Sequence, residues 1–255
     1  MTSSPVVAVI PAAGIGSRMQ ADRPKQYLTL QGKTILEHTV ELLLNHHAID
    51  YLVIAISPHD NYFPSLSIVN NPKVKVVEGG NERADSVLNA VNTLPENTWA
   101  LVHDAARPCV STHDITNLLA VMENNQVAGG ILASRVRDTM KRGVQQKTED
   151  TGLSAVSATL LTASIPTVLH TESRENLWHA LTPQLFPTAL LKNALNSALA
   201  AGAIITDEAS AIEYSGHKVA LIDSDPANIK ITHPGDLPLA DFYLHQRQKA
   251  QAACE

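Results

Sequence analysis

Apolar and polar positions along the chain predict strands that alternate with helices. Short runs rich in β-branched residues, typical of buried parallel strands, occur at 6–10, 51–57, 74–78, 99–103 and 130–133. Segments with helical periodicity lie between them, at 34–44, 82–92 and 112–123. The first of these helices begins with Thr34 and Glu37, which form a capping-box pattern. Strands alternating with helices favour right-handed βαβ units, so we expect an α/β fold with helices on both faces of a parallel sheet.

The alternation is interrupted between residues 138 and 171. This stretch is polar at first and then rich in Ser, Thr, Ala and Leu, and its β-branched residues suggest an extended hairpin or projecting arm. The alternating pattern then returns, with helices expected at 188–201, 207–214 and 234–249, a strand at 218–222, and an extended segment at 228–232. We therefore expect a single domain over residues 1–255 with a β-arm at about 138–173.

Composition and charge narrow the classes of function. Hydrophobic residues make up 44% of the 255 positions, which is ample for a packed core. The net charge of −6 provides no global basic field, so we expect neither nucleic acid nor an anionic membrane as a partner. The sequence contains no run of about 18 apolar residues, so it predicts no transmembrane helix. The two cysteines are far apart, and the first residues lack the pattern of a signal peptide, so we expect a cytoplasmic protein.

Three loops with unusual composition follow predicted strands. They are Pro-Ala-Ala-Gly after residue 10, Gly-Gly-Asn-Glu-Arg after residue 78, and Asp-Ala-Ala-Arg-Pro after residue 103. Ligands of parallel α/β sheets bind beyond the carboxyl ends of the strands. The three loops are therefore expected to line one site.

The first loop has the composition of a phosphate-binding turn. Gly14 and Gly16 allow backbone amides to approach an anion, and Arg18 and Lys25 supply two cations nearby. The loop is neither a P-loop nor the dinucleotide fingerprint, because Met19 stands where the third glycine of that fingerprint would be. The alternative is a plain glycine turn with solvated cations.

The other two loops offer a carboxylate and a flat backbone surface. Asp104, at the end of a buried strand, is suited to holding Mg²⁺ or a water molecule on it, although a helix cap or an ion pair is an alternative. Gly79 and Gly80 would let a base lie on the backbone, and Ser86 could contact the polar edge of the base. The alternative for this loop is a tight turn before a helix.

Taken together, several blocks in this order resemble the 2-C-methyl-D-erythritol 4-phosphate cytidylyltransferases of non-mevalonate isoprenoid biosynthesis. The blocks are PAAGIGSRM, PKQYL, ILEH, VIAIS, GGNERADSV, LVHDAARP, RDTMKR, LWHALTPQ, ITDEAS and NIKIT. The resemblance implies a Rossmann-like nucleotidyltransferase sheet whose projecting β-arm embraces the partner in a homodimer. It also implies that CTP and methylerythritol phosphate are converted, with Mg²⁺, to the CDP-alcohol and pyrophosphate.

The resemblance assigns roles residue by residue. It implies that CTP is bound by Ala12, Ala13, Gly14, Gly80, Asn81 and Ser86. Arg18 and Lys25 would stabilise the charge that builds on the α-phosphate, and Arg174 and Lys230 would position the acceptor phosphate as the nucleophile. The residues implied to surround methylerythritol phosphate are Asp104, Arg107, Thr139, Thr182 and Thr206, with Asp104 also near the metal.

Three alternatives stay open at the level of sequence. A cytidylyltransferase acting on a pentitol phosphate such as ribitol 5-phosphate would share the CTP loops, although the HDAARP and LWHALTPQ blocks favour methylerythritol phosphate. A dinucleotide-dependent oxidoreductase would need an acidic residue at the end of the second strand. That strand ends in Ser57-Pro58-His59, with Asp60 close by. A regulatory nucleotide-binding protein without turnover is the third alternative.

Overall fold

The computed structural model describes residues 4–14, 19, 21–144 and 166–252. The chain divides into two compact units. The larger unit comprises Met1–Ser134 and Ala180–Glu255, and the smaller unit is the insert Arg135–His179.

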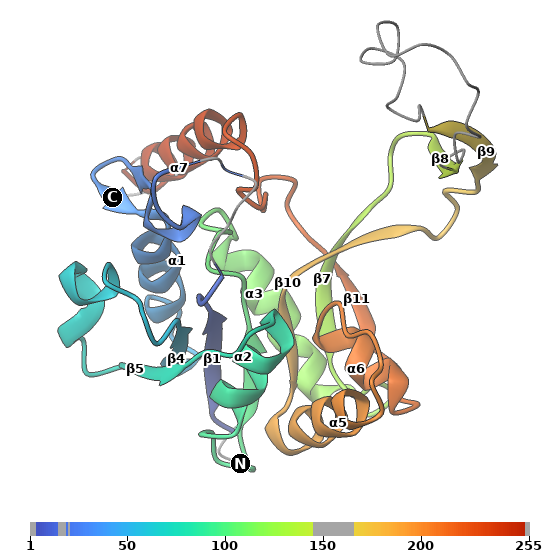
Figure 1. Ribbon diagram of the computed structural model, residues 1–255, viewed down its shortest axis with the longest axis horizontal. Coiled ribbons are helices and arrows are strands. Elements are labelled where there is room, and N and C mark those ends of the chain that lie inside the picture. Colours follow the sequence, from blue (N-terminus) through green and yellow to red (C-terminus); the bar gives the residue numbers. More distant parts are fainter. Residues whose placement is uncertain (1–3, 15–18, 20, 145–165, 253–255) are drawn as a thin grey trace, which may run out of the picture. The chain divides into compact units, whose positions relative to one another are not determined.

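A seven-stranded sheet with the order β11-β7-β10-β6-β1-β4-β5 forms the centre of the larger unit (Figure 1). Its strands are β1 (Val6–Pro11), β4 (Ile49–Ile56), β5 (Val74–Glu78), β6 (Trp99–Val102), β7 (Gly130–Arg135), β10 (Trp178–Pro187) and β11 (Ala220–Asp223). The helices are α1 (Ile35–Leu44), α2 (Arg83–Val91), α3 (Thr112–Leu119), α5 (Thr188–Ala200), α6 (Glu208–Tyr214) and α7 (Asp236–Ala252). A two-stranded ribbon of β2 (Thr29–Leu30) and β3 (Lys33–Thr34) precedes α1. No described helix combines the length and apolarity needed to cross a membrane.

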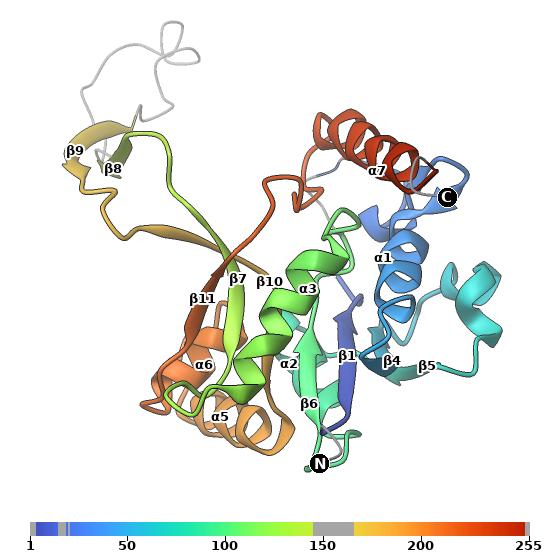
Figure 2. The same cartoon turned by 180° about the vertical axis from the view of Figure 1, so that it is seen from behind.

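The apolar runs of β1, β4 and β6 are buried because helices cover both faces of the sheet, whereas the edge strand β5, which was also expected to be buried, is largely exposed (Figures 1 and 2). In β1, Ala8 and Ile10 join a cluster with side chains of α1 and α3. Val7 and Val9 point to the other face and pack with side chains of α2, α5 and α6. This two-sided burial explains why the strands are continuous apolar runs rather than alternating ones.

Most of the predicted elements are confirmed, with ends that differ by a few residues. The expectation of a wholly parallel sheet is wrong at β10, which pairs antiparallel with β6 near the middle of the sheet. The sequence did not predict this strand because Pro183 and Pro187 argue against a central position. The segment 228–232, expected to be extended, forms no strand, and its Ile231 amide donates a hydrogen bond to the carbonyl of Ala106.

The helix α7 covers the loop that follows β6. Cys109, Ile231, Ala240 and Leu244 share a small apolar cluster, which joins α7 both to that loop and to the 228–232 segment. The Arg247 guanidinium also donates a hydrogen bond to the Cys109 carbonyl at 2.5 Å. The closing helix therefore holds two segments that reach the candidate site.

The smaller unit contains an antiparallel pair of strands, β8 (Met140–Val144) and β9 (Thr167–Glu172). An ion pair of 2.8 Å between Arg142 and Glu172 links them. The predicted extended structure of this segment is confirmed for these two strands. The remainder of the expected arm, residues 145–165, lies outside the described residues.

The start of α1 is stabilised by a capping box. Thr34 Oγ1 accepts from the Glu37 amide at 3.2 Å, and the Glu37 carboxylate accepts from the Thr34 amide at 2.8 Å. The second carboxylate oxygen accepts from the amide and hydroxyl of Ser67, at 2.9 and 2.7 Å. Burial acts to raise the pKa of Glu37, but these hydrogen bonds outweigh it and lower the pKa from 4.5 to about 2.

We predict that Glu37→Gln lowers the free energy of unfolding by about 2 kcal/mol at pH 7, because an amide cannot accept from both groups of donors. The folded-state pKa of Glu37 is depressed to about 2, so this stabilisation is complete above the unfolded value of 4.5 and is lost as the pH falls towards 2. Urea unfolding of both proteins at pH 7 and pH 3 measures this. Equal differences at the two pH values would contradict a role for the charged carboxylate.

Candidate active site

The loops after β1, β5 and β6 line one cavity of about 240 Å³ in the larger unit. Its lining residues are Pro11, Ala12, Ala13, Gly14, Lys25, Gln26, Gly80, Asn81, Glu82, Arg83, Ser86, Asp104, Ala105, Ala106 and Lys230. The prediction that the three loops share one site is confirmed. These loops meet because the parallel strands β1, β5 and β6 end at the same edge of the sheet.

Hydrogen bonds and close packing hold the loops around this first cavity in place. The Gln26 amide donates to the carbonyl oxygens of Ala12 and Gly14 at 2.8 and 3.0 Å. The Gly80 amide donates to Ser86 Oγ at 3.0 Å, which draws the Gly-Gly turn onto the first turn of α2. A Cβ on Gly80 would lie 2.2 Å from Cβ of Asp85, so this turn requires a glycine.

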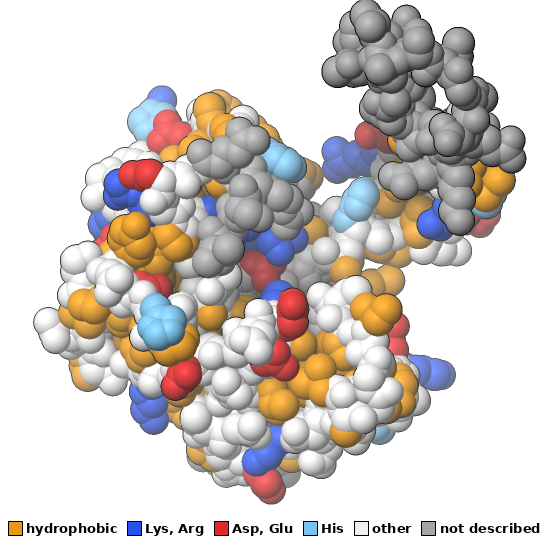
Figure 3. Space-filling model, viewed as in Figure 1, with side chains coloured by type: hydrophobic (Ala, Val, Ile, Leu, Met, Phe, Trp, Pro, Cys, Tyr) orange, Lys and Arg blue, Asp and Glu red, His pale blue; other side chains and the backbone are white. Residues whose placement is uncertain are grey.

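A second cavity, of about 250 Å³, lies against the first. It is lined by Arg83, Asp104, Arg107, Ala180, Leu181, Thr182, Gln184, Thr206, Asp207 and Lys230. Three of these residues, Arg83, Asp104 and Lys230, also line the first cavity. Figure 3 shows acidic and basic side chains meeting in the hollow of this face.

The carboxylate of Asp104 is the centre of the charges between the two cavities. It lies 3.0 Å from Arg83 Nε, 2.8 Å from Lys230 Nζ and 3.6 Å from Arg107 Nε. Burial acts to raise the pKa of Asp104, but Arg83, Lys230 and Arg107 outweigh it and hold the pKa well below its usual range. With Glu208, which also pairs with Arg83, the cluster contains two carboxylates and three cations. The excess of positive charge favours anionic ligands.

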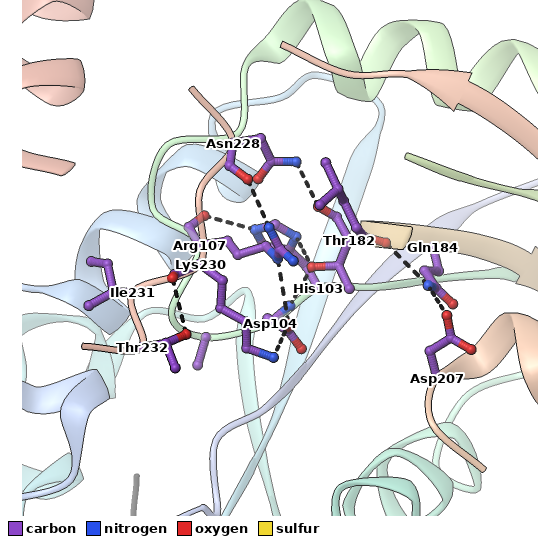
Figure 4. A network of polar contacts seen from close by, with 12 residues as sticks. His103, Asp104, Arg107, Thr182, Gln184, Asp207, Asn228, Lys230, Ile231 and Thr232 are labelled. Atoms are coloured by element: carbon purple, nitrogen blue, oxygen red, sulfur yellow. Dashed lines mark hydrogen bonds and ion pairs between the residues drawn. The ribbon is translucent and has the colours of Figure 1, made fainter. Parts of the chain in front are cut away.

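A chain of hydrogen bonds, in which each donor and acceptor can be assigned, supports the backbone of Asp104 (Figure 4). Burial lowers the pKa of His103 to about 4, so its imidazole is neutral at pH 7. The His103 Nε2–H must donate to the carbonyl of Arg107 at 3.0 Å, since a carbonyl only accepts. The unprotonated Nδ1 then accepts from the Thr182 hydroxyl at 3.1 Å, and Thr182 Oγ1 accepts from the Asp104 amide at 3.0 Å.

The structure brings together many of the residues that the sequence singled out. Predicted residues that line the first cavity are Ala12, Ala13, Gly14, Lys25, Gly80, Asn81, Ser86, Asp104 and Lys230. Predicted residues that line the second are Asp104, Arg107, Thr182, Thr206 and Lys230. Lys25 Nζ donates to the Ile231 carbonyl at 2.9 Å, one position from Lys230.

Three predicted residues do not lie among these. Arg18 falls outside the described residues. Thr139 and Arg174 belong to the smaller unit, where Thr139 is exposed and the Arg174 guanidinium donates to the carbonyl of Arg137.

Four polar residues that organise the cavities are not among those predicted from the sequence. Gln184 accepts from the Ala209 amide at 2.9 Å and donates to Asp207 at 2.9 Å, fixing the start of α6. Asn228 donates to the Thr182 carbonyl at 3.0 Å. Arg83 and Glu208 form an ion pair of 2.7 Å. All lie inside the quoted sequence blocks, but only the fold reveals their partners.

Asp104 is the main candidate ligand for a metal ion in these cavities. The described residues contain no group of three or more His, Cys, Asp or Glu side chains that could hold a metal ion. Both carboxylate oxygens of Asp104 already face cations. These residues fit a Mg²⁺ ion that is carried mainly by phosphates and uses at most one protein carboxylate, which is its usual behaviour with nucleotides.

Comparison with known proteins assigns the family. The family model for 2-C-methyl-D-erythritol 4-phosphate cytidylyltransferase matches residues 6–246. The chain belongs to this family. A cytidylyltransferase of this name from Alteromonas mediterranea is 59% identical over 251 residues, which is 98% of both chains. Another, from Pseudoalteromonas atlantica, is 53% identical over 248 residues, covering 97% of this chain and 99% of its own length.

Solved structures of cytidylyltransferases share the fold. The Francisella tularensis 2-C-methyl-D-erythritol 4-phosphate cytidylyltransferase matches with a TM-score of 0.72 and 35% identity, covering 94% of this chain and 100% of that one. A 4-diphosphocytidyl-2C-methyl-D-erythritol synthase matches with a TM-score of 0.75 and 34% identity, over 95% of this chain and 99% of that one. The α/β sheet expected for the cytidylyltransferase family is thus confirmed.

We predict that Thr182→Val destabilises this cytidylyltransferase by about 2 kcal/mol or more, because it leaves two buried polar groups, the Asp104 amide and His103 Nδ1, without partners. Thr182→Ser keeps the hydroxyl and should recover most of the loss. Urea unfolding of the three proteins measures the difference. Equal stability of the valine and serine variants would contradict the hydrogen-bond chain.

Proposed function

We propose that this protein transfers a cytidylyl group from CTP to 2-C-methyl-D-erythritol 4-phosphate. The products are 4-diphosphocytidyl-2-C-methyl-D-erythritol and pyrophosphate, in the non-mevalonate route to isoprenoids. Membership of the family supports this activity. The observation that carries it is the pair of adjoining cavities, since a two-substrate transfer needs sites that meet, and these meet at Asp104 and Lys230.

The first cavity is proposed as the CTP site. Its three loops supply small residues and backbone amides, which suit a flat base and a chain of phosphates. The residues proposed to bind CTP are Ala12, Ala13, Gly14, Gly80, Asn81 and Ser86. The Ser86 hydroxyl already accepts from the Gly80 amide, so it would place that turn under the base as well as contact it.

The chemistry is an in-line displacement between phosphates. An oxygen of the acceptor phosphate attacks the α-phosphorus of CTP, the new O–P bond forms, and the bond to the bridging oxygen of the β-phosphate breaks to release pyrophosphate. The attacking phosphate is already ionised at neutral pH, so no general base is needed. The barrier is charge repulsion and positioning, which fixed cations relieve. We propose Arg18, Lys25, Arg174 and Lys230 for this role.

The second cavity is proposed as the acceptor site. Its proposed contacts to methylerythritol phosphate are Asp104, Arg107, Thr182 and Thr206. Thr139, in the smaller unit, is proposed as a further contact to this substrate. Arg107 supports this role because it is buried beside Asp104 and faces the cavity with a fixed positive charge. The pentitol phosphates stay as the alternative acceptors.

We also propose that Mg²⁺ enters with CTP, beside Asp104. When bound, it would neutralise triphosphate charge and assist departure of pyrophosphate. Asp104 would contribute a carboxylate, while Arg83 and Lys230 keep that carboxylate ionised and oriented.

The smaller unit is proposed as a dimerisation arm that brings Arg174 to a substrate phosphate. Val168 and Leu169 on β9 are each 61% exposed, which is a high exposure for adjacent apolar side chains. We further propose a cytoplasmic location, since Cys109 is a buried free thiol and the chain carries few cysteines. Fractionation of disrupted cells tests this location.

We predict release of pyrophosphate from CTP in the presence of Mg²⁺ and methylerythritol phosphate, and its abolition when EDTA removes the metal. A coupled pyrophosphate assay with methylerythritol phosphate and with ribitol 5-phosphate measures the acceptor preference. Faster turnover with ribitol 5-phosphate would overturn the proposed substrate, and NADH binding without CTP binding would revive the oxidoreductase alternative.

Two variants that each remove one cationic side chain test the proposed catalytic roles in the same assay. Arg18→Ala and Lys25→Ala should each reduce kcat by roughly 100-fold or more if they stabilise transition-state charge. Circular dichroism should show an intact fold in both. If both variants turn over at the wild-type rate, Arg18 and Lys25 do not stabilise the charge of the transition state.

We predict the mass of a dimer in solution and its conversion to a monomer by Val168→Glu with Leu169→Glu. Two buried carboxylates would be unfavourable in a paired apolar surface. Light scattering after size-exclusion chromatography measures the mass. A wild-type mass of one chain would reject the dimer.

A further inference from the structure

Arg83 lies in the wall between the two cavities. Together with Asp104 and Lys230 it lines both of them. Its side chain is 29% exposed, whereas that of Glu208, its partner, is 1% exposed. Arg83 therefore reaches from a buried carboxylate to the boundary where the two proposed substrates would meet.

The Arg83 guanidinium makes a forked contact with Glu208. Nη1 donates to Oε1 at 2.7 Å and Nη2 donates to Oε2 at 3.1 Å, while Nε donates to Asp104 Oδ1 at 3.0 Å. Three donors in one plane thus bind two carboxylates from different parts of the fold. Such a bidentate contact fixes the orientation of the arginine as well as its position.

The pair connects the loops of the two cavities. Arg83 is the first residue of α2, three residues after Gly80 of the first cavity. Glu208 is the first residue of α6, directly after Thr206 and Asp207 of the second cavity. The ion pair therefore holds the beginnings of two helices together at the place where both cavities open.

Apolar packing already holds these two helices in the fold. Val87, Ala90 and Val91 of α2 share a buried cluster with Ala211 and Ile212 of α6. A buried ion pair adds little net stability compared with apolar side chains of the same size. What the pair adds is a fixed geometry, because it determines where the Gly-Gly turn and the Asp104 carboxylate stand relative to α6.

We infer that Arg83 and Glu208 are positioning residues for the transfer reaction: Glu208 orients the Arg83 fork, and Arg83 sets the distance between the nucleotide loop and the acceptor side through Asp104. This inference rests on the proposed function. An in-line displacement is sensitive to such distances, because a displacement of about 1 Å can reduce the rate by roughly 100-fold.

The test compares two buried glutamates. Glu208→Gln keeps the shape of the side chain and one acceptor but removes its charge, so we expect kcat to fall by about 10- to 100-fold while KM for CTP changes by less than about threefold. Glu37→Gln is the matched control, because Glu37 is also buried and multiply hydrogen-bonded, but its partners Thr34 and Ser67 line neither cavity, whereas Arg83, the partner of Glu208, lines both. It should lower stability and leave kcat per folded molecule unchanged.

A double variant tests whether the two residues act as a unit. Arg83→Lys keeps the positive charge but loses the fork, and should reduce kcat. Arg83→Lys combined with Glu208→Gln should be no slower than the slower single variant, since residues that act together are not additive. Multiplicative losses would overturn the coupling, and a kcat for Glu208→Gln equal to that of the wild type would overturn the inference.

A measurement without turnover separates this inference from the proposed function. Hydrogen exchange followed by mass spectrometry should show faster exchange at residues 80–91 in Glu208→Gln, and unchanged exchange there in Glu37→Gln. If wild-type protein releases no pyrophosphate, the proposed function fails while exchange still tests the positioning. If exchange at 80–91 is the same in all three proteins, the positioning role is rejected.

Discussion

The buried carboxylate of Asp104 is the charge on which the candidate site depends. A lone carboxylate at the end of a central strand would be costly to bury, and three cations from separate segments compensate it. Each cation belongs to a different segment. Arg83 lies in α2, Arg107 in the loop after β6, and Lys230 in the irregular segment that precedes α7. The electrostatic requirement of one residue thus gathers three segments that the sheet topology alone would leave independent.

Behind this charged cluster the polar groups have fixed directions. The neutral imidazole of His103, the Thr182 hydroxyl and the Asp104 amide form a chain in which every proton has one acceptor. A preorganised arrangement of this kind needs no reorganisation when charge develops at a reacting phosphate. It also explains why a histidine beside a catalytic region can be structural: burial keeps it neutral, and both ring nitrogens are occupied.

The sequence predicted those parts of the fold that depend on local pattern. Buried parallel strands such as β1 and β6 are continuous apolar runs, and α1 begins at a capping box, so both could be located without tertiary information. The loops after β1, β5 and β6 could be placed at one site for the same reason. By contrast, Arg83 and Glu208 are 125 positions apart, and no local rule connects them. β10 was missed because its prolines are tolerated only in its particular sheet context.

The antiparallel strand β10 has a consequence for how the chain can vary. β7 and β10 are neighbours in the sheet, and the insert Arg135–His179 leaves from one and returns through the other. The chain therefore departs and re-enters at adjacent points, so residues can be added to or removed from the insert with only a small change in loop-closure entropy. The strand register that pairs Gln184 with Val102 of β6 does not depend on the length of the insert. The insert can thus diverge in length and sequence while the catalytic framework keeps its geometry.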